Sequence, residues 1–331
     1  MKKIIVVIVL LLLANVVSAQ GQGPFCGGVG TAGCDAIKAD SSAILAWATG
    51  VTIVRGPQNI SMPDSPLVTF GEDESVVLGP ASSYTTDAVS LGDGGTATLT
   101  FDRPIRNGNG PDFAVFENAM KNNQTGGYFL ELAFVEVSSD GEHFVRFPAT
   151  SLVQDSVQAG PFADTDPTLI NNLAGKYQVG YGTPFDLEEL KDSSGLDIDA
   201  VTHVRIVDVV GAIDSAYASY DAFGHIVNDP WPTNFNSGGF DLTGVAVMHQ
   251  VGEDVVGHEA LSVVAYPNPV CEMLTVSGLL RGSRVRLIDT MGRTLSDVVA
   301  EGDTMAIAMD DLPKGVYILS VDQSVLRLVK Y

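Results

Sequence analysis

Residues 202–210 read THVRIVDVV, and residues 130–138 read LELAFVEVS. Both stretches are rich in valine and other strand-forming residues, and neither contains glycine or proline. Because alternate side chains of a strand lie on the same face, each stretch predicts a strand with at least one largely apolar face. Such strands become stable only when that face is buried against a second layer. The two stretches therefore predict a core of packed β-sheets.

Similar short runs, separated by polar turns, occupy the surrounding sequence. The other predicted strands of this region are 96–101, 112–118, 144–147 and 240–248. The turns include Gly92-Asp93-Gly94-Gly95 and the hairpin signal Ser139-Asp140-Gly141. Strands do not alternate with long helical patterns, and only 185–191 suggests a short helix. We therefore predict an all-β protein whose main domain is a jelly-roll-like β-sandwich.

The charge of the chain is concentrated in this main domain. The 331 residues carry 40 acidic and 18 basic side chains, for a net charge of −22. Residues 20–261 hold 32 acids and 9 bases (−23), residues 262–331 hold 8 acids and 7 bases (−1), and the leader supplies two lysines. A nucleic-acid-binding function is excluded, because phosphate recognition depends on Lys and Arg.

The first residues have the pattern of a secretory signal peptide. Lys2 and Lys3 precede the apolar run 4–14, and Val17-Ser18-Ala19 supplies small residues before Gln20. The run is too short to span a membrane, which takes about 20 residues. We predict a signal peptide at 1–19 and no transmembrane segment after its cleavage. In the oxidising compartment outside the cytoplasm, Cys26 and Cys34 are predicted to form a disulfide.

A small domain is predicted at the end of the chain. Short apolar runs between turns over residues 262–331 predict a seven-stranded, Ig-like β-sandwich, joined to the acidic domain (20–249) by a linker at 250–261. The motifs YPNP (266–269), VRLID (285–289), MGR (291–293) and LPKGVY (312–317) resemble the type A C-terminal sorting domain of the type IX secretion system. The resemblance implies delivery by the type IX secretion machinery, removal of the domain by a sortase-like peptidase, and a secreted or surface-attached product.

Several carboxylates fall on apolar strand faces of the acidic domain. Glu117, Glu136 and Asp208 each share a face with hydrophobic side chains, and Glu131 lies in a strand that is apolar on both sides. A buried carboxylate needs a cation or strong hydrogen-bond donors. Arg103, Arg146 and Arg205 can satisfy a few of these groups, but bases are scarce. We therefore predict bound calcium, which prefers oxygen ligands.

A loop region adds further oxygen ligands. Aspartates recur with glycine and asparagine after the strand at 202–210, although the spacing of an EF-hand is absent. The alternative is that these residues simply form turns. The predicted calcium ligands of the domain are Glu117, Glu136, Asp208, Asp214, Asp221, Asp229 and Asp241.

A second resemblance covers residues 36–250. Long stretches such as SLGDGGTATLTFDRPIRNGNGPDFAVFEN (90–118) and NDPWPTNFNSGGFDLTGVAV (228–247) are similar to an uncharacterised family of secreted bacterial cell surface proteins. The strand pattern also resembles galactose-binding-like jelly rolls, which commonly bind a structural calcium and often a glycan. The resemblance implies a surface module that captures a glycan or another small-molecule nutrient.

Aromatic side chains in loops are predicted to form the binding site for this ligand. Trp231, Tyr220 and Phe235 lie in the Asp/Gly-rich region and can stack on a sugar or another planar group, although capping one end of the core is an alternative. No catalytic motif is present, and the five histidines are scattered. The function predicted is a calcium-stabilised ligand-binding module. The alternatives are a secreted glycan-active hydrolase or lyase, and a structural or adhesive surface protein.

Overall fold

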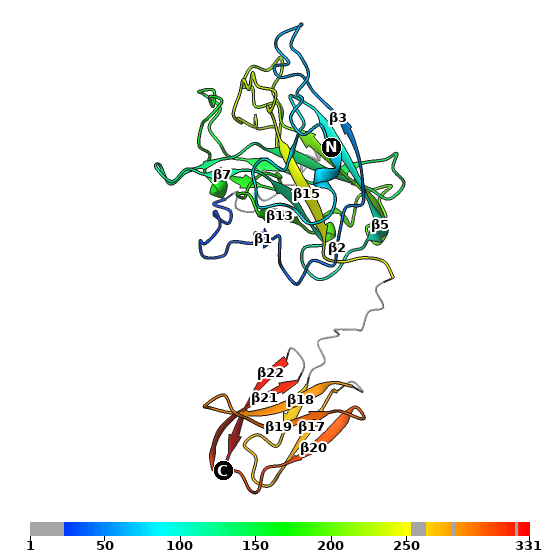
Figure 1. Ribbon diagram of the computed structural model, residues 1–331, viewed down its shortest axis with the longest axis vertical. Helices are drawn as coiled ribbons and strands as arrows, with labels where there is room; N and C mark the ends of the chain where they lie inside the picture. Colours follow the sequence, from blue (N-terminus) through cyan, green and yellow to red (C-terminus); the bar gives the residue numbers. More distant parts are fainter. Residues whose placement is uncertain (1–22, 253–262, 280–281, 322–323) are drawn as a thin grey trace, which may run out of the picture. The chain divides into compact units, whose positions relative to one another are not determined.

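The computed structural model of the protein describes residues 23–252, 263–279, 282–321 and 324–331 (Figure 1). The chain divides into two compact units, Met1–Val251 and Gly252–Tyr331. The predicted signal peptide at 1–19 lies outside the described residues, as does the predicted linker apart from residues 250–252. Among the described residues there is no helix with the length and hydropathy needed to cross a membrane.

Two antiparallel sheets form the body of the first unit. The first sheet runs in the order β1 (Ile37–Lys38), β13 (Tyr181–Phe185), β6 (Phe113–Glu117), β15 (Asp241–Val247) and β2 (Ala46–Trp47), with β4 (Val89–Ser90) also on β15. The second sheet runs in the order β10 (Val145–Arg146), β9 (Ala133–Ser138), β14 (Val201–Asp208), β5 (Thr96–Ile105) and β3 (Gly50–Val54). Shorter pairs join β7 (Met120–Lys121) to β8 (Tyr128–Phe129), and β11 (Thr150–Ser151) to β12 (Ile170–Asn171).

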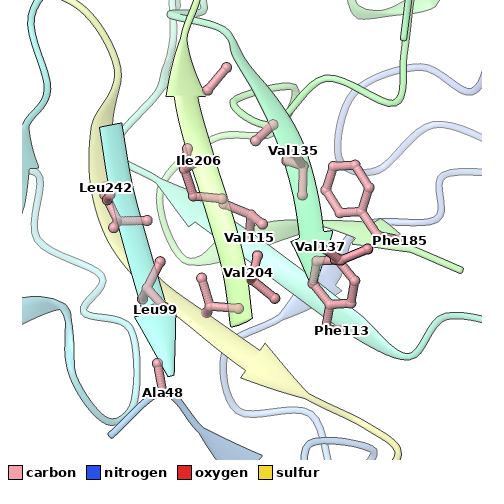
Figure 2. Close-up of a cluster of buried hydrophobic side chains, with 14 of the residues drawn as sticks. Ala48, Leu99, Phe113, Val115, Val135, Val137, Phe185, Val204, Ile206 and Leu242 are labelled. Atoms are coloured by element: carbon pink, nitrogen blue, oxygen red, sulfur yellow. The ribbon is translucent and has the colours of Figure 1, made fainter. Parts of the chain in front are cut away.

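The main hydrophobic core lies between these two sheets (Figure 2). Val204 and Ile206 of β14 pack beside Leu99 of β5, while Val115 of β6 and Leu242 of β15 reach the core from the other sheet. The alternation from Val204 onward matches the predicted period of two, because Val204, Ile206 and Asp208 are buried and the residues between them are half-buried. This packing confirms the predicted all-β fold and its sandwich architecture.

The strand β13 was not predicted, and a long-range contact accounts for it. β13 contains Gly182 and Pro184, which are usually poor strand residues, and it pairs with β6 because Phe185 stacks on Phe113 with ring centroids 5.3 Å apart. The helix suggested at 185–191 is reduced to a 3₁₀ turn, η3 (Leu187–Leu190). The other 3₁₀ turns of the described chain are η1 (Glu74–Val77) and η2 (Pro167–Leu169).

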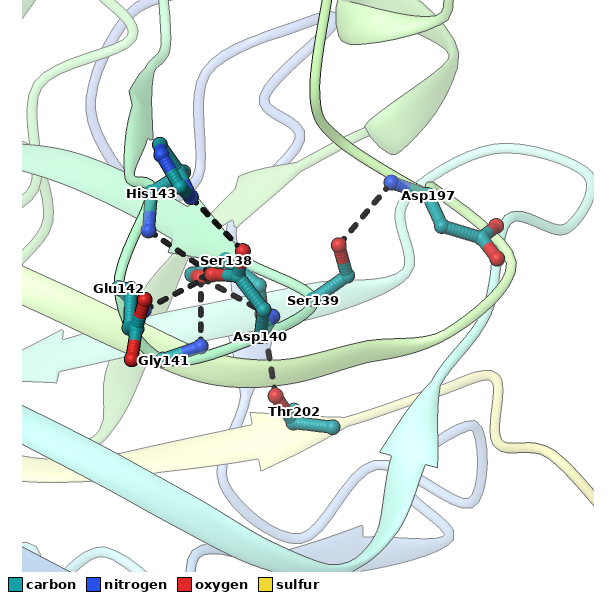
Figure 3. Close-up of polar contacts among 8 residues, drawn as sticks. All are labelled: Ser138, Ser139, Asp140, Gly141, Glu142, His143, Asp197 and Thr202. Carbon is teal, nitrogen blue, oxygen red and sulfur yellow. Dashed lines mark hydrogen bonds and ion pairs between the residues drawn. The ribbon is translucent and has the colours of Figure 1, made fainter.

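Figure 3 shows the predicted turn between β9 and β10. Asp140 Oδ1 accepts hydrogen bonds from the backbone N–H groups of Glu142 and His143, both at 2.8 Å, and Gly141 adopts a positive φ of 78°. The hydrogen bond from the His143 N–H is the main reason that the pKa of Asp140 is lowered. Asp140 therefore organises the turn as an ionised side chain, as the Ser-Asp-Gly signal predicts.

The second unit is a separate β-sandwich. Its described residues contain seven strands, as predicted, and they form two antiparallel sheets. One sheet has the order β16 (Val264–Tyr266), β17 (Met273–Ser277) and β20 (Thr304–Ala308). The other has the order β19 (Thr294–Val299), β18 (Arg284–Asp289), β21 (Gly315–Val321) and β22 (Ser324–Lys330). Its own core cluster includes Leu274, Val285, Leu287 and Leu319.

Candidate functional site

Several buried carboxylates lie at the ends of strands, at one end of the first unit. In an antiparallel sheet the end of one strand lies beside the start of its neighbour. Glu117 ends β6 and pairs with Leu242 at the start of β15, while Asp208 ends β14 and pairs with Ala133 at the start of β9. The carboxylates collected in this way are buried: Asp93, Glu117, Glu131, Asp208, Asp229 and Asp241.

Asp208 joins the two sheets. Its Oδ1 accepts the backbone N–H of Phe240, which leads into β15, at 2.7 Å. Its Oδ2 accepts the backbone N–H of Gly94, which leads into β5, at 2.9 Å. Burial raises the pKa of Asp208 well above its usual range, although both hydrogen bonds act in the opposite direction. We describe this arrangement as the Asp208 clamp, because one side chain fixes backbone from both layers.

Glu117 and Asp241 lie on neighbouring strands of the first sheet. Asp241 accepts hydrogen bonds from the Ser90 hydroxyl and, at 2.8 Å, from the Asn118 amide. Burial raises the pKa of Asp241 to about 6. Glu117 accepts the backbone N–H of Ala119 at Oε2, but its buried Oε1 has no hydrogen-bond partner among the described residues. Burial first, and the Asp241 charge second, raise the pKa of Glu117 well above its usual range.

Glu131 is the least compensated of these carboxylates. It is 5% exposed, and no hydrogen bond or ion pair from the described part of the chain reaches its carboxylate. Burial raises the pKa of Glu131 well above its usual range, and the charges of Asp241 and Glu117 add to the effect. Arg55, the guanidinium whose charge acts on Asp241, donates its hydrogen bonds to backbone carbonyl groups.

Glu131 and Asp241 line a cleft of about 750 Å³. Cavities of roughly 300–1,000 Å³ are typical of sites for small organic ligands. Amide and hydroxyl groups, which can pair with sugar hydroxyls, line it at Asn118, Asn122, Asn123, Gln124, Thr85 and Thr233. The cleft therefore combines buried carboxylates with neutral polar groups.

One wall of the cleft is aromatic. The Phe162 ring lies 6.5 Å from the Phe129 ring and 5.6 Å from the Phe235 ring, measured between centroids, and Phe70 also lines the cleft. Phe162 is 75% exposed and Phe235 is 41% exposed. Exposed aromatic rings beside a cleft provide flat apolar surface for a ligand. We call Phe129, Phe162 and Phe235 the phenylalanine wall.

The structure brings some of the predicted calcium ligands together and not others. Glu117, Asp208, Asp229 and Asp241 belong to the group of buried carboxylates, whereas Glu136, Asp214 and Asp221 are held by other contacts. Glu136 is engaged by two arginines, with Arg146 Nη2 at 2.7 Å and Arg205 Nη2 at 2.5 Å, so its carboxylate is paired within the sheet. The physical reason is register, because Arg205 and Arg146 sit directly opposite Glu136 on β14 and β10.

Three further predicted ligands lie in separate loops. Asp214 is exposed and accepts the Ala216 N–H, while Asp221 accepts backbone N–H groups of Ser151, Phe223 and His225. Burial would raise the pKa of Asp221, but these hydrogen bonds outweigh it and the pKa is lowered. Asp229 accepts the Leu132 N–H at Oδ2, and its buried Oδ1 has no partner among the described residues. Within the described ranges, no three His, Cys, Asp or Glu side chains are placed to hold a metal ion.

The predicted aromatic ligand-binding residues divide between two places. Phe235 lines the cleft together with Asp241. Trp231 lies elsewhere, with its indole N–H donating to Asp93 at 3.0 Å and its ring stacked near Tyr217. Tyr220 is 45% exposed but does not line the cleft. The sequence contains no signal for Phe129, which lies in the two-residue strand β8, or for Phe162, which lies in a loop, and it indicated Glu131 as a buried acid.

The predicted disulfide is not formed in the structure. Cys26 and Cys34 are both free, as is Cys271. The sulfur of Cys26 instead lies 3.2 Å from the Tyr177 hydroxyl and accepts a hydrogen bond from Lys176 Nζ at 3.3 Å. These contacts direct Cys26 toward the buried Lys176 and Tyr177 side chains.

Comparison with known proteins identifies the second unit. Residues 264–330 match the family described as the secretion system C-terminal sorting domain. The protein is therefore delivered by type IX secretion, interacts with that machinery, and is secreted or attached to the outer cell surface. A comparison of the chain with curated proteins gave no match.

Two solved structures show weak similarity. PorZ, a surface component of the type IX secretion system of Porphyromonas gingivalis, is 22% identical over 27% of this chain and 14% of its own, with a TM-score of 0.22. The BSP domain of a biofilm associated protein is 12% identical over 71% of this chain and 48% of its own, with a TM-score of 0.17. The chain thus spans less than half the length of either structure.

Proposed function

We propose that the first unit is a glycan-binding module that type IX secretion carries to the cell surface. The observation that supports this function is the cleft, whose lining combines the phenylalanine wall with amide, hydroxyl and carboxylate groups. Sugar rings have one apolar face and a rim of hydroxyls, so an aromatic wall with polar groups nearby is suited to them. The proposed membership of residues 36–250 in a family of secreted cell surface proteins agrees with this role.

Removing the phenylalanine wall tests this proposal. We expect Phe162→Ala to weaken binding of glycans identified on an array by about tenfold, because ring contacts are worth roughly 1–2 kcal/mol. The exposed ring of Phe162 contributes little to the core, so the thermal unfolding midpoint should stay unchanged. Phe223→Ala is the matched control, because Phe223 is also exposed but does not line the cleft. Equal effects of the two substitutions would contradict the proposal.

Calcium stabilisation of the first unit stays a prediction. Its support is the presence of buried carboxylates that do not line the cleft, such as Asp208 and Asp229, and not a formed metal centre. If calcium is bound, chelation with EDTA lowers the midpoint of thermal unfolding, and added calcium restores it by mass action. An unchanged midpoint in EDTA and in excess calcium would remove the prediction.

A glycan-active enzyme is the second candidate function. The observation that favours it is that Glu131 and Asp241, two carboxylates with raised pKa values, line the same cleft. Glycoside hydrolysis commonly uses one carboxyl group as an acid and a second as a base or nucleophile. Release of reducing ends from the bound glycan, abolished by Asp241→Asn, would favour the enzyme over the binding module.

A further inference from the structure

The cleft contains buried carboxyl groups that no basic side chain of the described residues pairs with. Glu131 is 95% buried, lines the cleft, and has no hydrogen bond or ion pair within the described ranges. Asp241 also lines the cleft, and Asp241 and Glu117 are near enough for their charges to act on Glu131. Among the described lining residues Lys121 alone is basic, and its ammonium is placed over the Tyr128 ring, 5.5 Å from the centroid. The carboxyl groups of Glu131 and Asp241, which we call the cleft floor, can therefore pair with a positively charged ligand.

A metal ion is a poor match for this floor. The described residues provide no group of three side chains arranged for metal binding, and calcium usually takes six to eight oxygen ligands. The wall beside the floor is made of phenylalanine rings, which offer calcium no oxygen ligands. An organic cation has different requirements, because carboxylates and aromatic faces both attract an ammonium group.

We infer that the cleft binds a ligand with a primary ammonium group, such as an amino sugar, placed against Glu131 and Asp241. The sugar rings then lie along the phenylalanine wall, and the ring hydroxyls face the amides of residues such as Asn118. The ammonium brings three donors, and Asp241 retains lone pairs beyond those used by Ser90 and Asn118. The inference rests on the proposed glycan-binding function and specifies the class of sugar.

Titration calorimetry with matched oligosaccharides tests the inference. The probes are the β-1,4-linked tetramer of glucosamine and its fully N-acetylated counterpart, which differ in charge and in the acetyl groups. Binding is measured with the full chain, in EDTA and at near-physiological salt. We expect the glucosamine tetramer to bind at least about tenfold more tightly, as one charge-assisted contact of roughly 1.5–3 kcal/mol implies.

A pair of isosteric variants distinguishes specific binding at Glu131 from non-specific attraction to the acidic domain. Glu131→Gln removes the buried charge, and Glu142→Gln removes an exposed charge in the β9–β10 turn. We expect Glu131→Gln to reduce the preference for the charged tetramer to within about twofold, and Glu142→Gln to leave it unchanged. Glu131→Gln removes an unpaired buried carboxylate, so its thermal midpoint should not fall.

The possible failures are distinguishable. Equal affinity for the two tetramers overturns the inference and leaves glycan binding in place. Equal losses of affinity in the two variants also overturn it, because attraction would then come from the acidic surface as a whole. If neither tetramer binds and no glycan on an array binds, the proposed function fails together with the inference.

Discussion

Asp208→Ala is expected to destabilise the first unit by about 1–3 kcal/mol, because two backbone N–H groups, one of them buried, lose their acceptors. These donors belong to Phe240 and Gly94, which lead into strands of opposite sheets. The substitution therefore loosens the contact between the two layers at the cleft end. Chemical denaturation followed by circular dichroism measures the change in the free energy of unfolding.

The matched control is Asp214→Ala. Asp214 was predicted as a calcium ligand like Asp208, but it is exposed and caps only a local turn. We expect this substitution to change the free energy of unfolding by less than about 0.5–1 kcal/mol. Measurements in EDTA keep metal out of the comparison. If the two variants unfold at the same denaturant concentration, the Asp208 clamp does not join the sheets as described.

Lowering the pH from about 8 to about 5.5 is expected to stabilise the first unit in EDTA. Glu117 and Glu131 have pKa values raised well above their usual range, and burial raises that of Asp241 to about 6. A carboxyl group with a raised pKa binds more protons in the folded state than in the unfolded state. Stability therefore falls as the pH rises through the window between the unfolded and folded pKa values.

Substitution of Glu117 isolates this effect. Glu117→Gln removes one charge of the cluster and supplies an N–H donor close to carboxylates, so we expect a gain of about 1–3 kcal/mol near pH 8. The gain should shrink as the pH approaches 5, where the native glutamate is protonated. Thermal unfolding at a series of pH values measures both trends, with Glu142→Gln as the control for net charge. A pH-independent effect of Glu117→Gln would contradict the assignment.

Sequence alone was sufficient for the fold and for the burial of individual carboxylates. The period-two pattern of THVRIVDVV placed Asp208 on the inner face of β14, where it is 2% exposed. The same reasoning identified Glu117 and Glu136 as buried. These predictions succeed because the direction of a side chain in a strand depends only on its position in that strand.

The ion-pair partners of those carboxylates could not be predicted from the alternation of side chains. Glu136 meets Arg205 and Arg146 through the pairing register of three strands, and register is a property of the assembled sheet. The cleft depends on Phe162 and Phe129, which come from a loop and from a two-residue strand. Short and irregular segments carry no period, so their convergence needs three-dimensional information.

The hydrophobic core of the first unit has a consequence for the protein after export. This unit has its own core cluster, and the Val251 N–H near its end donates a hydrogen bond to the Pro104 carbonyl oxygen at 2.8 Å. A protease that cuts after Val251 would remove the sorting domain and leave the core of the first unit intact. We therefore expect the cleft to be as well formed in the trimmed protein at the cell surface as in the precursor.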